Sequence, residues 1–168
     1  MHIRPEQPAD YEAIFALHTA AFGQPGEAKL VDELRRQAMP FVSLVAVKDV
    51  VVVGHIAFTP VTLPGHADLK IMGLAPMAVA SDCQRQGIGL ELIKEGLAQC
   101  KALGYGAVVV LGHPNYYPRA GFVPAHNFNI RCVYDAPPEA FLLIELLPGY
   151  LQNASGTIAY HPAFAMVE

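Results

Sequence analysis

A short loop near the middle of the chain has the residue types and spacing of an anion-binding site. The sequence QRQGIG occupies positions 84–89, between an apolar extended run at 74–80 and an amphipathic helical pattern. In this order, unpaired backbone N–H groups converge at the positive end of a helix dipole, where a phosphate or pyrophosphate is stabilised. Gly87 and Gly89 have no Cβ, so a bulky anion can approach the backbone closely. We therefore expect a nucleotide-like ligand.

Two other phosphate-binding loops do not fit these residues. No Lys-Ser or Lys-Thr pair follows Gly89, as a P-loop requires. Leu92 stands where the third glycine of a dinucleotide-binding fingerprint would be. Without its surroundings, the two-glycine loop is as compatible with a structural turn as with phosphate binding, so the neighbouring elements must decide.

The hydrophobic pattern predicts the elements that position the loop. Strands are expected at 3–5, 43–47, 51–59, 71–80, 107–111 and 141–147, and helices at 8–22, 30–38 and 86–103, with a helical turn at 116–120. The strands within 43–59 form an antiparallel hairpin. The unit 71–111 reads strand, loop, helix, strand, and so long a connection makes its two strands parallel. The sequence therefore predicts an α/β fold with a mixed sheet and helices on both faces.

Two motifs in order resemble the GNAT superfamily of acyl-CoA-dependent N-acyltransferases. Gln84, Gly87 and Gly89 match the fixed positions of its [Q/R]-x-x-G-x-[G/A] acyl-CoA motif, and the segment 117–122 resembles its Y-x-x-x-G-F segment. The order of predicted elements is similar to that of the family over about 1–122. The stretch 104–125 is similar to one bacterial branch of predicted N-acetyltransferases.

The resemblance implies a fold and an activity. The chain would be a single domain over 1–168, with a mostly antiparallel sheet whose fourth and fifth strands form a splayed parallel pair that holds acyl-CoA, within about 71–122. The activity would be direct transfer of an acetyl group from acetyl-CoA to a primary amine of a small-molecule or peptide acceptor. Two alternatives stay open: a CoA-binding regulatory or sensor module without turnover, and an interaction protein whose glycine loop is structural.

The resemblance also assigns residues to the cofactor. Pantetheine would pair with the fourth strand at Met77, Ala78 and Val79. Pyrophosphate would lie on the loop formed by Gln84, Arg85, Gln86, Gly87, Ile88, Gly89 and Leu90. A backbone N–H near Val79 would polarise the thioester carbonyl. Pro76 cannot donate to a sheet ladder, which fits a bulge there and also an ordinary edge strand. Arg85 either reaches a CoA phosphate or faces solvent.

Tyr117 is the general acid that the resemblance implies, because it stands four residues before Gly121, where the family's tyrosine lies. A phenol with a pKa near 10 can protonate the departing CoA thiolate. Tyr116 is the alternative. A tyrosine pair after a buried strand is also compatible with a plain pocket wall.

The group that takes the proton from the amine is less determined. Glu27 follows the turn between the first two helices, which borders the acceptor pocket in relatives, yet a glutamate at a helix start is also a partner of the helix dipole. His113 follows the fifth strand at the edge where ligands collect in open sheets, but it fits a loop hydrogen bond equally well. Water alone is the third option.

Composition excludes several other classes. The net charge is −4 and Lys and Arg do not cluster, so no nucleic-acid partner is expected. The seven histidines lack metal-binding spacing, so no metal is expected. Three separate cysteines fit a reducing compartment; Cys83, beside the loop, is either a thiol activated by the helix or a bystander. No apolar run reaches the roughly 20 residues that span a bilayer, so we expect a cytoplasmic protein, for which a homodimer is compatible with the apolar composition.

Overall fold

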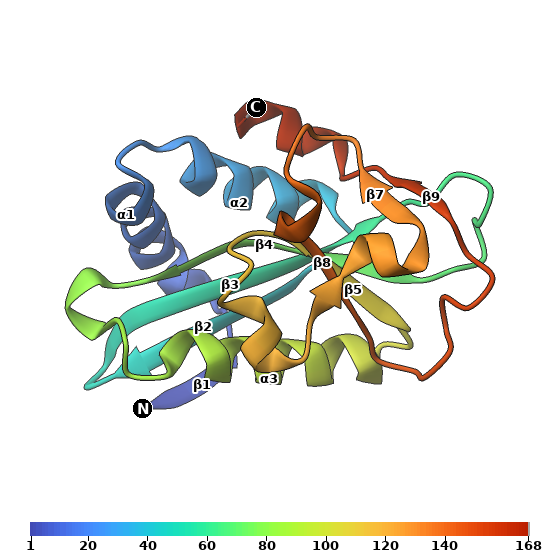
Figure 1. Cartoon of the computed structure of the whole chain (residues 1–168). Helices are drawn as coiled ribbons and strands as arrows, with labels where there is room; N and C mark the ends of the chain where they lie inside the picture. The colour runs from blue at the N-terminus through green and yellow to red at the C-terminus, as the bar shows by residue number, and fades with distance from the viewer. Residues whose placement is uncertain (168) are drawn as a thin grey trace.

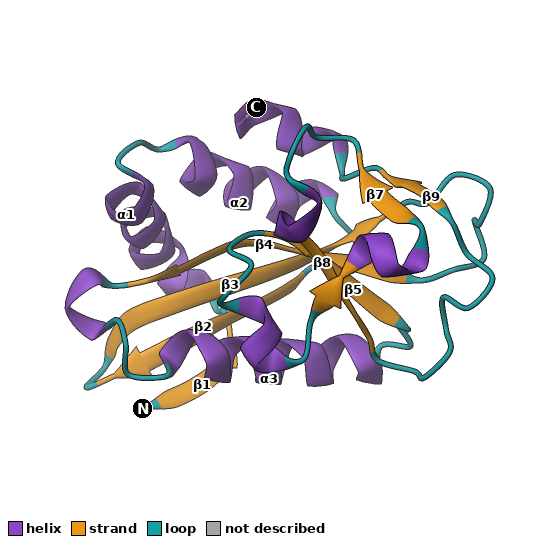
Figure 2. Cartoon of the chain, in the orientation of Figure 1, coloured by secondary structure: helices purple, strands orange, loops and turns teal. Residues whose placement is uncertain are grey.

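The computed structural model describes residues 1–167 and consists of a twisted mixed sheet between helices (Figures 1 and 2). Its strands lie in the order β1-β2-β3-β4-β5-β8-β6, and a short parallel pair, β7 and β9, lies apart from them. The strands are β1 (His2–Pro5), β2 (Val42–Lys48), β3 (Val51–Val61), β4 (Ile71–Val79), β5 (Ala107–Leu111), β6 (Val123–Pro124), β7 (Ile130–Cys132), β8 (Phe141–Glu145) and β9 (Gly156–Ile158).

Helices cover both faces of the sheet, as predicted. Helices α1 and α2 pack over one face and α3 over the other, while the C-terminal turn η6 lies beside α2 (Figure 1). The α-helices are α1 (Tyr11–Phe22), α2 (Gly26–Gln37) and α3 (Ile88–Ala102), and the 3₁₀ turns are η1 (Pro8–Asp10), η2 (Ser81–Cys83), η3 (Tyr117–Ala120), η4 (Ala125–Phe128), η5 (Pro138–Ala140) and η6 (Pro162–Val167). Within residues 1–167, none of these helices is long and apolar enough to cross a membrane.

The helix α3 starts two residues later than the sequence predicts. Gly87 has a φ of 83°, in the left-handed region, and forms the N-cap of the helix instead of its first turn. Apolar side chains of α3, including Leu92 and Ile93, then pack with Phe58 of β3 in the main core. This packing fixes the start of α3 directly beside the end of β4.

The parallel pairing of β4 with β5 is short, and this opens the sheet. Ile71 to Gly73 pair with Ala107 to Val109, and beyond Gly73 the two strands share no register partners. All other neighbours in the main sheet of the described residues are antiparallel. The prediction of a mostly antiparallel sheet with a parallel fourth and fifth strand is therefore confirmed.

A bulge on β4 follows the end of that pairing. Phe58 of β3 pairs with Leu74, but Ile56 pairs with Met77, so β4 contains one residue more than β3 in this interval. Pro76 lies in the extra segment, where its missing N–H leaves no gap in the ladder. The sequence allowed a bulge or an ordinary edge strand at Pro76, and the structure has the bulge.

A chain of buried and half-buried polar side chains ties the N-terminal half of the sheet to α1 and α2. Ser43 Oγ donates to Glu6 Oε1 at 2.6 Å and so accepts from His55 Nε2 at 2.7 Å. His55 Nδ1 then accepts from His18 Nε2 at 2.8 Å. Arg35 of α2 closes the chain with two hydrogen bonds to Glu6, at 2.7 and 2.9 Å.

The protonation of the two histidines is opposed by their surroundings. Burial lowers the pKa of His18 to about 4. Burial, and then the charges of His18 and Arg35, lower the pKa of His55 well below 6.5. An unfolded chain binds protons at both rings below about pH 6.5, while the folded chain does not.

We predict that the free energy of unfolding falls as pH is lowered from about 6.5 toward 4. For each histidine that stays neutral in the folded state, the free energy of unfolding falls by as much as about 1.4 kcal/mol per pH unit in this window. Urea unfolding at stepped pH values measures the slope. His18→Gln should flatten the slope, whereas His126→Gln, at an exposed histidine, should keep it. An unchanged slope in His18→Gln would contradict the assignment.

Candidate active site

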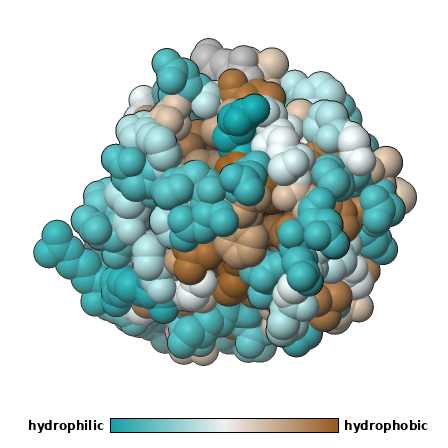
Figure 3. Space-filling view, turned by 45° about the vertical axis from the view of Figure 1, so that its right-hand side comes forward, coloured by the Kyte–Doolittle hydropathy of each residue, from teal (hydrophilic) through white to brown (hydrophobic). Residues whose placement is uncertain are grey.

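Two cavities open where β4 leaves β5. The loop cavity, of about 560 Å³, lies between the end of β4 and the start of α3; its walls include Val79, Gln84, Arg85, Gly87, Gly89 and Tyr116. The aromatic cavity, of about 470 Å³, lies on the other side; its walls include Phe22, Glu27, Tyr117, Tyr134, Tyr160 and Phe164. Phe22 and Met77 line both cavities, so the two meet there. Apolar surface gathers in the middle of one face of the molecule, with polar residues around it (Figure 3).

The backbone of the predicted anion-binding loop is shaped by left-handed residues. Arg85 has a φ of 63° and Gly87 a φ of 83°. A left-handed φ is uncommon for a residue other than glycine and costs conformational energy. At Arg85 the loop adopts this unfavourable conformation just before α3 begins. Alternation of left- and right-handed residues turns successive N–H groups inward, which makes a concave site for an anion. Arg85 and Gly87 line the loop cavity, where such a backbone would meet an anion.

Gln84 and the end of β4 hold each other in place. The Gln84 side chain donates to the carbonyl of Val79 at 3.3 Å. The N–H of Ala80 donates to Val53 of β3, and backbone groups of successive strand residues point to opposite edges. The N–H and C=O of Val79 therefore point away from β3, into the space that β5 has left. Gln84 thus braces the loop, which the motif alone does not reveal.

Tyr116 and Tyr117 are neighbours in sequence but line different cavities. Their rings meet edge to face with centroids 5.2 Å apart. The Tyr116 hydroxyl lies against Gly89, so close that a Cβ at position 89 would collide with it. Tyr117 instead lines the aromatic cavity and packs on Phe122, with ring centroids 5.7 Å apart. The two side chains therefore border different cavities.

Both tyrosines keep their protons at neutral pH. Burial, and then the neighbouring Tyr116, raise the pKa of Tyr117 to about 12. Burial also raises the pKa of Tyr116, although the charge of Arg119 opposes this. Arg119 lies over the Tyr116 ring, 5.9 Å from its centroid, and joins Arg85 in lining the loop cavity. The sequence did not single out Arg119, because nothing in its spacing relates it to the loop.

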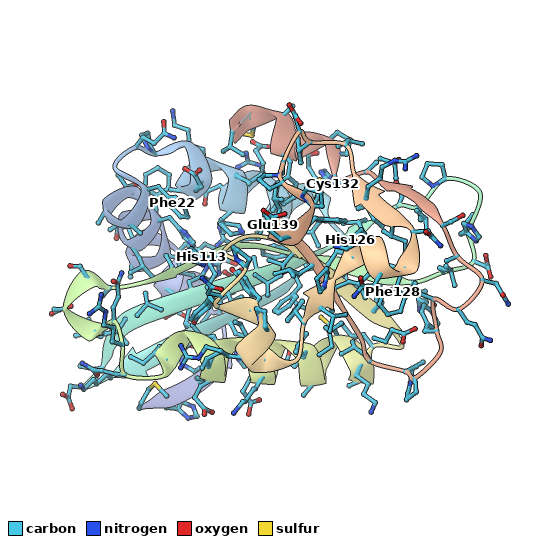
Figure 4. All side chains as sticks on the ribbon, viewed as in Figure 1. Phe22, His113, His126, Phe128, Cys132 and Glu139 are labelled. Carbon is cyan, nitrogen blue, oxygen red and sulfur yellow. The ribbon has the colours of Figure 1, made fainter. Side chains whose placement is uncertain are left out.

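The two predicted bases are placed differently. Glu27 lies in the first turn of α2 and lines the aromatic cavity. Its Oε1 is buried and has no hydrogen-bond partner among residues 1–167. His113 is exposed and lines neither cavity; its Nδ1 accepts from the N–H of Asn115 at 3.2 Å. Figure 4 shows Phe22 at the end of α1 and His113 in the loop after β5.

Sequence reasoning missed the aromatic residues that close the second cavity. Tyr134, Tyr160 and Phe164 come from segments after Phe122, where strands are only two to five residues long. The rings of Tyr134 and Tyr160 stack with centroids 5.6 Å apart, and those of Tyr160 and Phe164 lie 5.3 Å apart. Short strands carry no usable periodicity, so the pattern offered no signal for this wall.

The Cys83 thiol beside the loop is not activated. Burial, followed by the Asp82 carboxylate, raises the pKa of the Cys83 thiol, so the start of α3 does not activate it. Among residues 1–167, no group of three or more His, Cys, Asp or Glu side chains could hold a metal ion.

Known proteins share this architecture. A family model described as an acetyltransferase (GNAT) domain matches residues 2–125. The Escherichia coli (strain K12) protein YhbS, described as an uncharacterized N-acetyltransferase, is 39% identical over 165 residues, 98% of each chain. The crystal structure of Escherichia coli YhbS in complex with CoA superposes with a TM-score of 0.92, at 38% identity over 98% of this chain and 91% of that one. The crystal structure of a Brucella melitensis GNAT acetyltransferase in complex with acetyl-CoA superposes with a TM-score of 0.79, at 38% identity over 97% of each chain.

This architecture, together with the family model and the relatives that match nearly the whole chain, identifies an acyltransferase. The chain belongs to the GNAT family of acetyltransferases, because the family model covers most of its length and the relatives match nearly all of it. The family predicted from the two sequence motifs is therefore confirmed.

Proposed function

We propose that this protein transfers an acetyl group from acetyl-CoA directly to a primary amine. The observation that carries the proposal is the meeting of the two cavities at Phe22 and Met77, beside Tyr117 and the free edge of β4. A site of this shape lets two ligands approach one another from opposite sides. No covalent enzyme intermediate is then needed, in keeping with a Cys83 thiol that is not activated.

Acetyl-CoA occupies the loop cavity in this proposal. Its pyrophosphate accepts hydrogen bonds from loop N–H groups between Arg85 and Leu90, and its negative charge is favoured by the start of α3. Arg85 and Arg119 line the cavity and add positive charge. The pantetheine amides pair with the edge of β4 at Met77 to Val79, which β5 leaves open. Structures of relatives at 38% identity that contain CoA or acetyl-CoA support this choice of ligand.

The amine enters through the aromatic cavity as an ammonium ion. Glu27 is the charged group on that wall among the described residues, and its carboxylate attracts the ammonium and accepts a proton from it, directly or through water. The neutral nitrogen then attacks the thioester carbon. The new C–N bond places negative charge on the carbonyl oxygen, which the N–H of Val79 stabilises.

Collapse of this intermediate breaks the C–S bond and releases CoA as a thiolate. The nitrogen gives its remaining excess proton to water, because Glu27 already carries the first one, and Tyr117 gives its phenolic proton to the sulfur. The Tyr117 phenolate then regains a proton from water. A pKa of about 12 keeps Tyr117 protonated until the reaction needs it. The same dry surroundings raise the basicity of the leaving thiolate, which partly offsets the weaker acidity of the phenol.

Replacing Gly87 tests the cofactor site. Gly87 has a φ of 83° and open space around its Cβ position. Gly87→Glu puts a side chain and a negative charge into this space, so acetyl-CoA should bind at least about tenfold more weakly, a loss of about 1.4 kcal/mol of binding free energy. Isothermal titration calorimetry measures the dissociation constant. Gly65→Glu is the matched control, because Gly65 has a φ of 89°, similar open space and no part in the loop. Wild-type affinity in Gly87→Glu would mean that the pyrophosphate lies elsewhere.

Replacing Tyr117 tests the chemistry. Tyr117→Phe keeps the ring that packs on Phe122 and removes the proton donor, so the rate constant for transfer should fall about 100-fold or more. The affinity for acetyl-CoA should stay at the wild-type value. With an acyl donor whose thiol leaves more readily, the fall in the rate constant should be smaller. Single-turnover kinetics measures the step. Tyr116→Phe should be milder; an equal small effect from both variants would remove the phenol from the mechanism.

Loss of turnover separates the proposal from the sensor alternative. An enzyme consumes acetyl-CoA in the presence of an amine and loses this activity in Tyr117→Phe while still binding the cofactor. A protein that binds acetyl-CoA but acetylates no amine of a broad panel would instead be a regulatory module of the same fold.

A further inference from the structure

The wall of the aromatic cavity is made almost entirely of apolar surface and rings. Tyr134, Tyr160 and Phe164 form a continuous row of rings in mutual contact. Tyr117 and Phe22 face the same space from the side where the two cavities meet. Its volume of about 470 Å³ falls within the range of sites for small organic molecules.

The phenols on this wall stay neutral. Burial, and then the nearby Cys132, Tyr134 and Tyr117, raise the pKa of Tyr160 far above its usual value. Its hydroxyl oxygen is buried without a hydrogen-bond partner among residues 1–167. The ring, not a charge, is therefore what Tyr160 offers to a ligand.

Charge on the wall is confined to one place. Among the described residues that line the cavity, Glu27 is an acid and none is Lys, Arg or His. Its Oε1 is buried and unpaired in residues 1–167, and a buried carboxylate oxygen without a partner is costly. A single ammonium group would satisfy it. A second cationic group on the ligand would find no second carboxylate, and an anionic group would meet only rings and Glu27.

We infer that the acceptor is a small primary monoamine whose body is uncharged and apolar, with an aromatic ring as the best fit. This inference rests on the proposed function, since it assigns the acceptor of the same reaction. The ammonium lies against Glu27 near the thioester, and the body of the molecule lies among the rings of Tyr134, Tyr160 and Phe164. Aromatic rings also favour an ammonium near their faces, which adds to the attraction.

A matched set of amines tests the inference with acetyl-CoA as donor. 2-Phenylethylamine should exceed ethylamine in kcat/KM by about 10- to 100-fold, the effect of burying a phenyl-sized group. L-Phenylalanine keeps the ring and adds a carboxylate, and it should react at least about 100-fold more slowly, because that carboxylate would be buried without a cation. Spermidine represents a polycationic acceptor and a short lysine peptide represents a peptide acceptor. Both should have a lower kcat/KM than 2-phenylethylamine.

Variants of the wall show whether the ring binds where the inference places it. Phe164→Leu shortens the row of rings and should raise KM for 2-phenylethylamine about tenfold, with little change for ethylamine. Phe128→Leu makes the same change in η4, outside the cavity, and should leave KM unchanged for both amines. Circular dichroism and acetyl-CoA binding confirm that each variant is folded. Tyr160→Phe, which keeps the ring and removes the unpaired hydroxyl, should retain the preference for the aromatic amine.

The outcomes separate the two levels of the proposal. Faster transfer to spermidine, L-phenylalanine or the lysine peptide than to 2-phenylethylamine would overturn the inference and leave the proposed acetyl transfer standing. An equal effect of Phe164→Leu on both alkyl and aryl amines would also overturn it. Transfer to none of these amines, with acetyl-CoA still bound, would overturn the proposed function itself.

Discussion

The site depends on one departure from regular sheet pairing. After Gly73, β4 continues for another six residues without β5 at its side. Backbone N–H and C=O groups must be paired wherever water is excluded, so an open strand edge inside a fold demands a partner. Here the bulge at Pro76 and the start of α3 hold the edge open. A ligand with amide groups of its own can complete the pairing, and the pantetheine arm of CoA is such a ligand.

The same opening places adjacent tyrosines in different cavities. The 3₁₀ turn η3 follows β5 in the chain, and Tyr116 and Tyr117 at its start line the two cavities. Tyr116 reaches the loop at Gly89, while Tyr117 reaches the aromatic cavity. In the proposed mechanism, Tyr117 lies beside the point where the two cavities meet and protonates a leaving group that stays on one side while the new amide leaves on the other.

The sequence predicted the parts of this site that depend on local constraints. Gln84, Gly87 and Gly89 mark a loop at a helix start, and β5 is an unbroken apolar run, as expected for a strand covered on both faces. The role of Tyr117 as general acid comes from the resemblance to the family's motif and stays a prediction. The start of α3 was misplaced by two residues, because propensity does not reveal that Gly87 adopts a left-handed φ.

The acceptor side was beyond the reach of sequence patterns. Tyr134 and Tyr160 are 26 positions apart in a region of short strands and turns, and only tertiary packing brings their rings together. The proposal of Glu27 over His113 as the base likewise rests on which side chain reaches a cavity. Spacing along the chain carries no such information, whereas burial and an unpaired oxygen at Glu27 do.

Backbone amide exchange in the free edge of β4 tests the central claim most directly. Hydrogen exchange followed by NMR, with and without acetyl-CoA, reports whether the amides of Met77 and Val79 gain a hydrogen-bond partner on binding. The account predicts marked slowing at these two positions and in the loop from Arg85 to Leu90, and little change in β1, which lies at the far edge of the sheet. Bound acetyl-CoA that leaves exchange in β4 unchanged and slows it elsewhere would contradict the account.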